Sequence, residues 1–269
     1  MTDRVAILGA GKMGEALLSG LLRAGRSPAD LTVTTREPER AKLITERHGV
    51  EVVDNAAAIK FADTIVIAVK PQDMGSLLDE ISAHVSSSQL VVSVAAGITT
   101  SFIERRLGDE VPVVRVMSNT PVLVDEAMSA ISAGSHAAEE HLVRTEALLR
   151  PVGSTIRVPE SQQDAVTALS GSGPAYFFYL VEAMTDAGIL LGLPRATAHD
   201  LIVQTAIGAA VMLRDSGESP QALREAVMSP AGTTIAAIRQ MEDHKVRAAF
   251  LAALEAARDR SRELASGHE

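Results

Sequence analysis

The stretch VAILGAGKMG at residues 5–14 decides the fold of this chain. An apolar run leads directly into a GxGxxG motif, and a helical pattern follows it. In a strand–turn–helix unit of this kind the first glycine makes the turn, the second lets the backbone approach a pyrophosphate, and the third lets the helix pack on the strand. The helix N-terminus adds N–H groups and a positive dipole end. The stretch therefore predicts a dinucleotide site, and its residues are Gly9, Gly11, Lys12, Met13 and Gly14.

The composition narrows the class of protein. The 269 residues are 46% hydrophobic and only 3% aromatic, so the core must consist mainly of aliphatic side chains. There is no cysteine, which excludes disulfides, zinc–thiolate sites and thiol nucleophiles and fits a reducing cytosol. A net charge of −9 argues against a nucleic-acid surface.

No segment has the pattern of a signal peptide or a membrane span. The N-terminal MTDR leads straight into an apolar strand pattern. The longest apolar stretch, Ala175–Leu193, carries Glu182 and Asp186 and is interpreted as a buried helix. We therefore expect a soluble, cytoplasmic protein that binds neither membranes nor nucleic acid.

The first 160 residues alternate strand and helix patterns. The expected strands are Arg4–Leu8, Leu31–Thr35, Thr64–Ala68, Leu90–Ser93, Val113–Val116, Met128–Ser132 and Thr155–Val158. The expected helices are Glu15–Ala24, Pro38–His48, Asp73–Ala83, Thr99–Leu107 and Ala138–Leu149. Strands rich in Val, Ile and Leu without polar alternation favour a parallel sheet covered on both faces. This half is therefore predicted to be an α/β domain with a Rossmann-type doubly wound sheet.

After Pro159 only helical patterns follow. They cover Gln162–Ser170, Ala175–Gly192, Arg195–Asp215, Pro220–Met228, Thr233–Glu242 and Lys245–Ala265. The second and third are apolar on nearly every face, which is typical of buried helices, yet the domain is too small to surround both. We predict a Rossmann domain at 1–160, an all-α dimerisation domain at 161–269, and a homodimer at least.

The end of the second strand indicates which dinucleotide binds. NAD-binding versions of this fold carry an acidic residue about 20 residues past the glycines, at a strand tip. Here that position holds Thr34, Thr35 and Arg36, and the following Glu37 is expected to point away or to pair with Arg40. A guanidinium forks onto a 2′-phosphate and hydroxyls donate to it. NADPH is therefore favoured over NADH, unless Arg36 is only a solvated loop residue.

Two further loops follow the ends of expected strands, where ligands bind in such sheets. Small residues there let a nicotinamide ribose lie against the backbone. Lys70 has three open interpretations: an acid catalyst, a cofactor contact, or a partner of Asp73, with cofactor contact preferred. The predicted cofactor residues of these loops are Ala68, Val69, Lys70, Pro71, Ala95, Ala96 and Gly97.

Two segments of the helical half suggest a substrate site. The run SGSGPAY at 170–176 opens a long helix and is interpreted either as a tight inter-domain turn or as a substrate contact. The run SPAGTT at 229–234 precedes another helix, and its N–H groups and hydroxyls suit a carboxylate better than a simple cap would require.

These motifs together resemble the pyrroline-5-carboxylate reductase family over essentially the whole chain. The resemblance rests on DAVTALSGSGPAY at 164–176, on VMSPAGTT at 227–234, and on the GxGxMG, VKP, AAG and RVMSNTP motifs of the first half. It implies reduction of 1-pyrroline-5-carboxylate to L-proline with NADPH or NADH, the last step of proline biosynthesis. It also implies an interlocked dimer, with further assembly to a decamer in many members.

The resemblance assigns site residues that spacing alone does not. It places Asn55 at the adenosine end of the cofactor beside Arg36, and Glu160 in the substrate pocket. The substrate carboxylate is expected on Ser229, Gly232, Thr233 and Thr234, with Thr234 at the ring nitrogen as the catalytic residue. Protonation of the imine nitrogen and hydride transfer need orientation and water exclusion from the protein.

Two positions depart from the family pattern, and two other functions compete. Ala231 replaces the first glycine of Pro-Gly-Gly-Thr, which is tolerable if its φ is negative, and Ser118 replaces a proline. A β-hydroxyacid dehydrogenase would need a lysine on the helix after Pro174, where tyrosines occur instead. A non-catalytic dinucleotide sensor would have no use for the 229–234 segment. The seven histidines form no metal-binding pattern, so no metal is expected.

Overall fold

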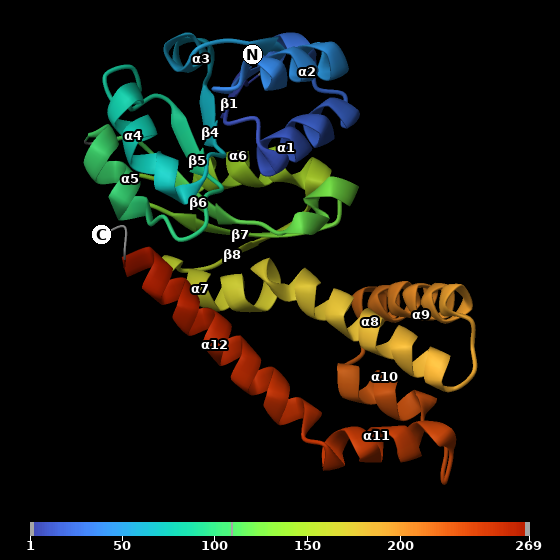
Figure 1. Ribbon diagram of the computed structural model, residues 1–269. Coiled ribbons are helices and arrows are strands. Elements are labelled where there is room, and N and C mark those ends of the chain that lie inside the picture. Colours follow the sequence, from blue (N-terminus) through green and yellow to red (C-terminus); the bar gives the residue numbers. More distant parts are fainter. Residues whose placement is uncertain (1–2, 109, 267–269) are drawn as a thin grey trace. The chain divides into compact units, whose positions relative to one another are not determined.

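The computed structural model describes residues 3–108 and 110–266 (Figure 1). Its strands are β1 (Val5–Leu8), β2 (Leu31–Thr34), β3 (Glu51–Val52), β4 (Thr64–Ile67), β5 (Leu90–Ser93), β6 (Val113–Met117), β7 (Ala127–Ala133) and β8 (Gly153–Arg157). Its helices are α1 (Lys12–Arg23), α2 (Pro38–His48), α3 (Asn55–Phe61), α4 (Pro71–Ile81), α5 (Thr100–Leu107), α6 (Glu139–Leu149), α7 (Gln163–Val166), α8 (Gly173–Leu190), α9 (Arg195–Asp215), α10 (Pro220–Val227), α11 (Thr233–Asp243) and α12 (Val246–Ser266). The predicted α/β fold class is confirmed.

The strands form one eight-stranded sheet in the order β3-β2-β1-β4-β5-β6-β7-β8. The first six strands pair in parallel, and β8 pairs in parallel with β7. The expectation of a purely parallel sheet is wrong at one place, because β7 runs antiparallel to β6. The reason lies in the connection: only the short turn at Thr120–Val124 joins β6 to β7, while a parallel crossover needs a dozen residues or more.

Both faces of the sheet are buried along β1, β2, β4, β5 and β6, which explains their continuous apolar sequences. Val5 and Ile7 of β1 face a core with α1 and α6, whereas Ala6 and Leu8 face a second core with α3, α4 and α5. All four side chains are fully buried. Figure 1 shows these helices on opposite sides of the strands. Alternate residues of β1 thus pack into different cores, and both sets are apolar. The strand therefore shows no alternation of polar and apolar residues.

One strand–helix pair was not expected from the sequence. β3 has only two residues, and α3 follows it directly. The signal for α3 was present in Asp54, whose Oδ1 accepts the N–H of Ala57 at 2.7 Å and so caps the helix. A two-residue edge strand is too short to give a periodicity of its own.

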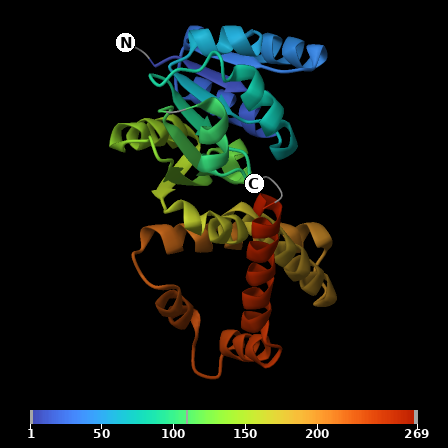
Figure 2. The same cartoon turned by 90° about the vertical axis from the view of Figure 1, so that its left-hand side faces the viewer.

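The chain divides into two compact units, which are described separately: residues 1–172 with 257–269, and residues 173–256. The first unit holds the sheet and the last turns of α12. The second holds α8 to α11 and the start of α12, and Figure 2 shows α12 as a single long helix. The sequence boundary at 160/161 stays a prediction, because this division is made on contacts alone.

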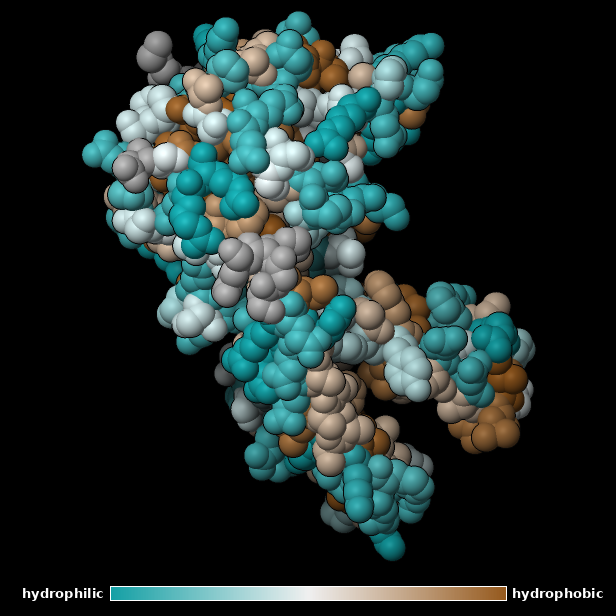
Figure 3. Space-filling model, turned by 60° about the vertical axis from the view of Figure 1, so that its left-hand side comes forward, coloured by the Kyte–Doolittle hydropathy of each residue, from teal (hydrophilic) through white to brown (hydrophobic). Residues whose placement is uncertain are grey.

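The second unit leaves much apolar surface uncovered. Phe177, Phe178 and Tyr179 of α8 are 66%, 69% and 74% exposed, and only Ala198 of α9 is buried. Figure 3 shows hydrophobic residues, in brown, on the surface of these helices. By length and composition α9 also qualifies as a candidate membrane span. Uncovered apolar helices of this size mark an association surface.

Candidate cofactor and substrate sites

The glycine turn between β1 and α1 has the geometry that a phosphate needs. Gly9 has φ +107°, and a side chain there would approach the carbonyl of Ala68 to 2.9 Å. A Cβ on Gly14 would collide with the carbonyl of Gly9. A Cβ on Gly11, by contrast, would meet nothing within 4 Å, so the backbone there faces open space at the start of α1. The turn is therefore shaped to admit a group at Gly11 and to hold the helix against the strand.

A pocket of about 500 Å³ opens beside this turn. It lies where β1, β2 and β4 end, which is the point at which the strand order reverses and where open α/β sheets bind their ligands. We call it the switch-point pocket. Its lining residues are Gly9, Ala10, Gly11, Thr34, Thr35, Arg36, Glu37, Val53, Asp54, Asn55, Ala68, Val69, Lys70, Asp73, Leu77 and Glu80. Its volume and mixed polar and apolar lining fit part of a dinucleotide.

Arg36 lines the pocket, but it is already paired. Its Nη1 lies 3.2 Å from Oδ1 of Asp73 in the first turn of α4, and the side chains are 68% and 37% exposed. Glu37 also lines the pocket. The expected alternative pairing of Glu37 with Arg40 is wrong, because Arg40 bonds Glu15 and donates from Nε to the carbonyl of Ala10 at 2.8 Å.

Asn55 and Lys70 also line the pocket. The Nδ2 group of Asn55 donates to Oε1 of Glu80 at 2.9 Å. The carboxylate of Asp73, one expected partner of Lys70, is held by Arg36 instead. Four carboxylates therefore face this pocket against two cations, Arg36 and Lys70.

Only some of the predicted cofactor residues line the switch-point pocket. Among the predicted cofactor residues, Lys12, Met13, Gly14, Pro71, Ala95, Ala96 and Gly97 do not line the switch-point pocket. The lining residues that the sequence did not indicate are Ala10, Glu37, Val53, Asp54, Asp73, Leu77 and Glu80. The spacing of 73, 77 and 80 was the available signal, because residues i, i+4 and i+7 share one helix face. Because β4 ends at the pocket and α4 follows it, this face of α4 lines the pocket.

An ionic cluster between α1 and α2 lies next to the glycine turn. Glu15 in α1 bonds Arg40, Arg47 at 2.8 Å and His48 at 3.2 Å, all from α2. Burial alone would raise the pKa of Glu15, but the bonds from His48 and Arg40 outweigh it and lower that pKa below its usual value. The cluster fixes α2 on α1, and Arg40 adds a direct bond to the turn.

The predicted anion-binding loop forms a tight turn in front of α11 (Figure 2, in orange). The N–H of Gly232 donates to the carbonyl of Ser229 at 3.0 Å, which closes the turn. Pro230 occupies the second position and Ala231 the third, with φ +59°. We expected alanine to be acceptable at position 231 if its φ was negative. The positive φ contradicts this expectation. The turn has the pattern of type II, whose third position requires positive φ and prefers glycine.

Gly232 and the threonines complete this loop. A Cβ on Gly232 would displace Oγ of Ser229 and would come within 3.1 Å of the Ser229 carbonyl oxygen. Thr233 begins α11, where the first N–H groups have no acceptor within the helix. Thr233 is exposed and Thr234 half-buried. The loop therefore offers N–H groups and hydroxyls to an anion, and it belongs to the second unit.

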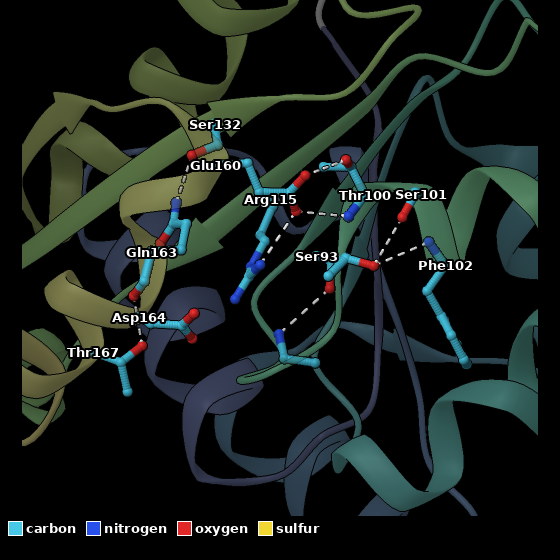
Figure 4. A network of polar contacts seen from close by, with 12 residues as sticks. Ser93, Thr100, Ser101, Phe102, Arg115, Ser132, Glu160, Gln163, Asp164 and Thr167 are labelled. Carbon is cyan, nitrogen blue, oxygen red and sulfur yellow. Dashed lines mark hydrogen bonds and ion pairs between the residues drawn. The ribbon is translucent and has the colours of Figure 1, made fainter. Parts of the chain in front are cut away.

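Glu160 lies in a polar network of the first unit (Figure 4). Its Oε1 accepts from the backbone N–H of Thr100 at 2.8 Å and from Nη1 of Arg115 at 3.2 Å, and its Oε2 accepts from Oγ1 of Thr100 at 2.6 Å. Arg115 is only 5% exposed. The carboxylate thus joins the start of α5 to β6, directly after the loop of Ala95 to Gly97. Its predicted contact with substrate stays a prediction.

Two of the sequence motifs meet within the first unit. Asn119, from RVMSNTP, donates from Nδ2 to the carbonyl of Ser170 at 3.2 Å, in SGSGPAY. A Cβ on Gly171 would collide with Met117. The residues 167–171 form a π-helical turn before α8. Ser118, which stands where the family has proline, accepts a bond from Ser129 at 2.9 Å. The run at 170–176 is therefore not a tight turn, since the π-helical turn at 167–171 leads within two residues into α8; its contact with substrate stays a prediction.

Metal ligands were not expected. In the two described ranges, 3–108 and 110–266, no group of three or more His, Asp or Glu side chains is placed to hold a metal ion.

Comparison with known proteins gives one consistent family. Residues 160–264 match the family described as pyrroline-5-carboxylate reductase dimerisation, and residues 4–97 match NADP oxidoreductase, coenzyme F420-dependent. The pyrroline-5-carboxylate reductase of Corynebacterium melassecola is 45% identical over 97% of this chain and 98% of its own length.

Solved structures agree with this match. A pyrroline-5-carboxylate reductase from Coxiella burnetii has a TM-score of 0.93 and 36% identity, over 98% of this chain and 99% of its own. The Plasmodium falciparum pyrroline carboxylate reductase, solved with NADP bound, has a TM-score of 0.87 and 28% identity, over 98% of each chain.

Proposed function

The chain belongs to the pyrroline-5-carboxylate reductase family, and we propose that the switch-point pocket and the loop 229–234 supply the two parts of its active site. The protein is an oxidoreductase that reduces 1-pyrroline-5-carboxylate to L-proline with NAD(P)H, the last step of proline biosynthesis. It assembles into a homo-oligomer through its helical domain. The exposed apolar faces of α8 and α9 are accounted for by this association.

The observation that carries the proposal is the turn at Ser229–Gly232 in front of α11. The bond from Gly232 to Ser229 closes this turn, and the first N–H groups of α11 have no acceptor within the helix and no side-chain cap. A carboxylate is stabilised there by the N–H groups and by the helix dipole. In this proposal the substrate carboxylate binds Ser229, Gly232 and Thr233, and Glu160 is a further proposed substrate-binding residue, from the first unit.

Thr234 is the proposed catalytic residue. Its hydroxyl hydrogen-bonds the ring nitrogen and holds it in one orientation, while the loop keeps the ring carbon in place and excludes water. The bound nicotinamide supplies the hydride that adds to that carbon. The ring nitrogen is protonated by Thr234 or by water; as hydride adds to the carbon, the π electron pair of the C=N bond moves onto that nitrogen and leaves a C–N single bond.

For the cofactor we propose that the glycine turn holds the pyrophosphate, with Lys12, Met13 and Gly14 at the start of α1. Thr34, Thr35 and Arg36 take the 2′-phosphate, and Asn55 lies at the adenosine. The VKP turn of Ala68 to Pro71 and the loop of Ala95 to Gly97 contact the nicotinamide ribose. The support is the open space at Gly11 and the place of Arg36 in the pocket wall.

Three further assignments belong to this proposal. A division at 160/161 gives a cofactor domain and a substrate domain, and it is supported by the family match that begins at 160. A cytoplasmic location is supported by the absence of cysteine from a biosynthetic reductase. For the assembly we propose a homodimer at least, with a decamer as the alternative.

Steady-state kinetics of Thr234→Ala test the substrate half. We expect kcat/KM for the imine to fall about 100-fold while the Kd for NADPH stays unchanged, since a catalytic hydrogen bond is lost. Thr45→Ala, an exposed threonine of α2, is the matched control and should behave as wild type. An unchanged kcat/KM in Thr234→Ala would remove Thr234 from the mechanism.

Arg36→Ala tests the cofactor half. The Kd for NADPH should rise about 10- to 100-fold and that for NADH by less than about twofold, because only NADPH carries the phosphate. Arg239→Ala, an exposed arginine of α11 that pairs with Asp243, controls for the loss of charge. Equal losses for both cofactors would refute the 2′-phosphate assignment.

A further inference from the structure

We infer that Asp73 is a specificity-determining residue that competes with the cofactor 2′-phosphate for Arg36 and thereby reduces the preference for NADPH over NADH. The inference rests on the proposed role of Arg36. Asp73 was expected only as a possible partner of Lys70, and it lies outside the glycine turn and the substrate loop.

The geometry places the two groups in competition. Arg36 and Asp73 both line the switch-point pocket, and Nη1 lies 3.2 Å from Oδ1. A phosphate on that guanidinium must either replace the carboxylate or share the guanidinium with it. In the second case the two anions lie about 7 Å apart, given the size of the guanidinium fork. Both outcomes penalise NADPH, and neither affects NADH.

Asp73 is also held where it is. It sits in the first turn of α4, where the helix dipole favours a negative charge, and its N–H donates to the carbonyl of Lys70 at 2.9 Å. Leu77, one turn along the same face, is buried. The backbone that carries Asp73 is therefore anchored beside the pocket.

The rest of the pocket strengthens the effect. Glu37, Asp54 and Glu80 add three carboxylates to the wall, against the two cations Arg36 and Lys70. Glu80 is bonded to Asn55, whereas Asp73 bonds the proposed phosphate-binding group itself. Of these carboxylates, Asp73 thus has the most direct influence on a 2′-phosphate.

The size of the effect follows from Coulomb's law. A dianion and a carboxylate about 7 Å apart in water repel enough to weaken binding about sevenfold at low salt. At physiological ionic strength screening reduces this to about two- to threefold. The ratio of the NADH and NADPH dissociation constants should therefore depend on salt in the wild type.

Asp73→Asn is the decisive variant, because Asn retains an oxygen that accepts from Arg36 and removes only the charge. The Kd for NADPH, measured by titration of its fluorescence without substrate, should fall about two- to threefold at 0.15 M salt and about sevenfold at low salt. The Kd for NADH should stay the same. An NADPH Kd that is unchanged or higher would overturn the inference.

Asp79→Asn is the matched control. Asp79 lies on the same helix and is 72% exposed, but it pairs with Arg106 at 3.7 Å and does not line the pocket. An equal gain in Asp79→Asn would mean that net charge alone acts, and would also overturn the inference. Arg36→Ala distinguishes a failure of the proposed function from a failure of this inference. If Arg36→Ala weakens the binding of NADPH and NADH equally, the proposed role of Arg36 is refuted. If it weakens only NADPH binding, but Asp73→Asn does not tighten NADPH binding, only the role of Asp73 is refuted.

Discussion

Removal of the Glu160 carboxylate should destabilise the first unit through the arginine it neutralises. Arg115 is 5% exposed and Glu160 27% exposed, and the carboxylate also accepts two bonds from Thr100. Breaking a fully buried pair costs about 3–5 kcal/mol, because the remaining charge is left uncompensated. Since Glu160 is about one quarter exposed, solvent screening lowers the expected cost of Glu160→Ala to about 2–3 kcal/mol.

Urea unfolding at a fixed protein concentration measures this cost, because the stability of an oligomer depends on concentration. The melting temperature should fall by about 5–10 °C. The double variant Arg115→Met/Glu160→Gln removes both charges and should recover most of the loss, to within about 1 kcal/mol of wild type. Glu139→Gln breaks an exposed pair with Arg157 and should cost less than about 0.5 kcal/mol.

Two results would refute this reasoning. A loss in Glu160→Ala no larger than that in Glu139→Gln would mean that Arg115 is well solvated. A double variant that is less stable than Glu160→Ala alone would mean that packing of the Arg115 side chain, rather than its charge, holds β6 to the start of α5.

Two further predictions concern the substrate loop and the ionic cluster at the glycine turn. Ala231→Val should cost about 2 kcal/mol of stability, because a β-branched side chain is strained at φ +59°, whereas Ala231→Gly should stay within about 0.5 kcal/mol of wild type. Thermal unfolding of both variants measures these differences. A valine variant as stable as wild type would contradict the positive φ. Glu15, with its lowered pKa, stabilises the fold above the unfolded carboxyl value of about 4.3 and loses this effect as the pH falls through its folded pKa. Urea midpoints of wild type and Glu15→Gln should therefore differ at pH 7 and converge toward pH 3, and a constant difference would exclude the carboxylate as the cause.

The fold could be predicted largely from local pattern. The apolar runs placed seven of the eight strands, and Pro38–His48 and Arg195–Asp215 were predicted with the helix bounds that the structure has. The strands are short continuous apolar runs, and each of these two helices has a proline at its start and a glycine just past its end, which are helix start and stop signals. The short β3 and the antiparallel β7 were not predicted, because each depends on pairing with a distant strand.

The candidate site was predicted where it rests on motifs and missed where it rests on packing. Gly9, Gly11, Arg36 and Asn55 line the switch-point pocket, and their contact with a cofactor stays a prediction. Asp73 also lines this pocket. The sequence near Asp73 does not show that the face of α4 with Asp73, Leu77 and Glu80 lies at the ends of β1 and β2.

By itself the sequence determined the strand–turn–helix at residues 5–14, the change from sheet to helices after Pro159, and a helical surface too apolar to stay uncovered. These follow from properties of neighbouring residues: glycine conformation, helix and strand periodicity, and hydrophobic content. Only the tertiary structure decided that Arg36 is held by Asp73, that Glu160 neutralises the buried Arg115, and that Ala231 adopts a positive φ. The first two join residues 37 and 45 positions apart, and the third is imposed on an alanine by the closure of its turn. Such contacts depend on how the whole chain packs, which no local pattern encodes.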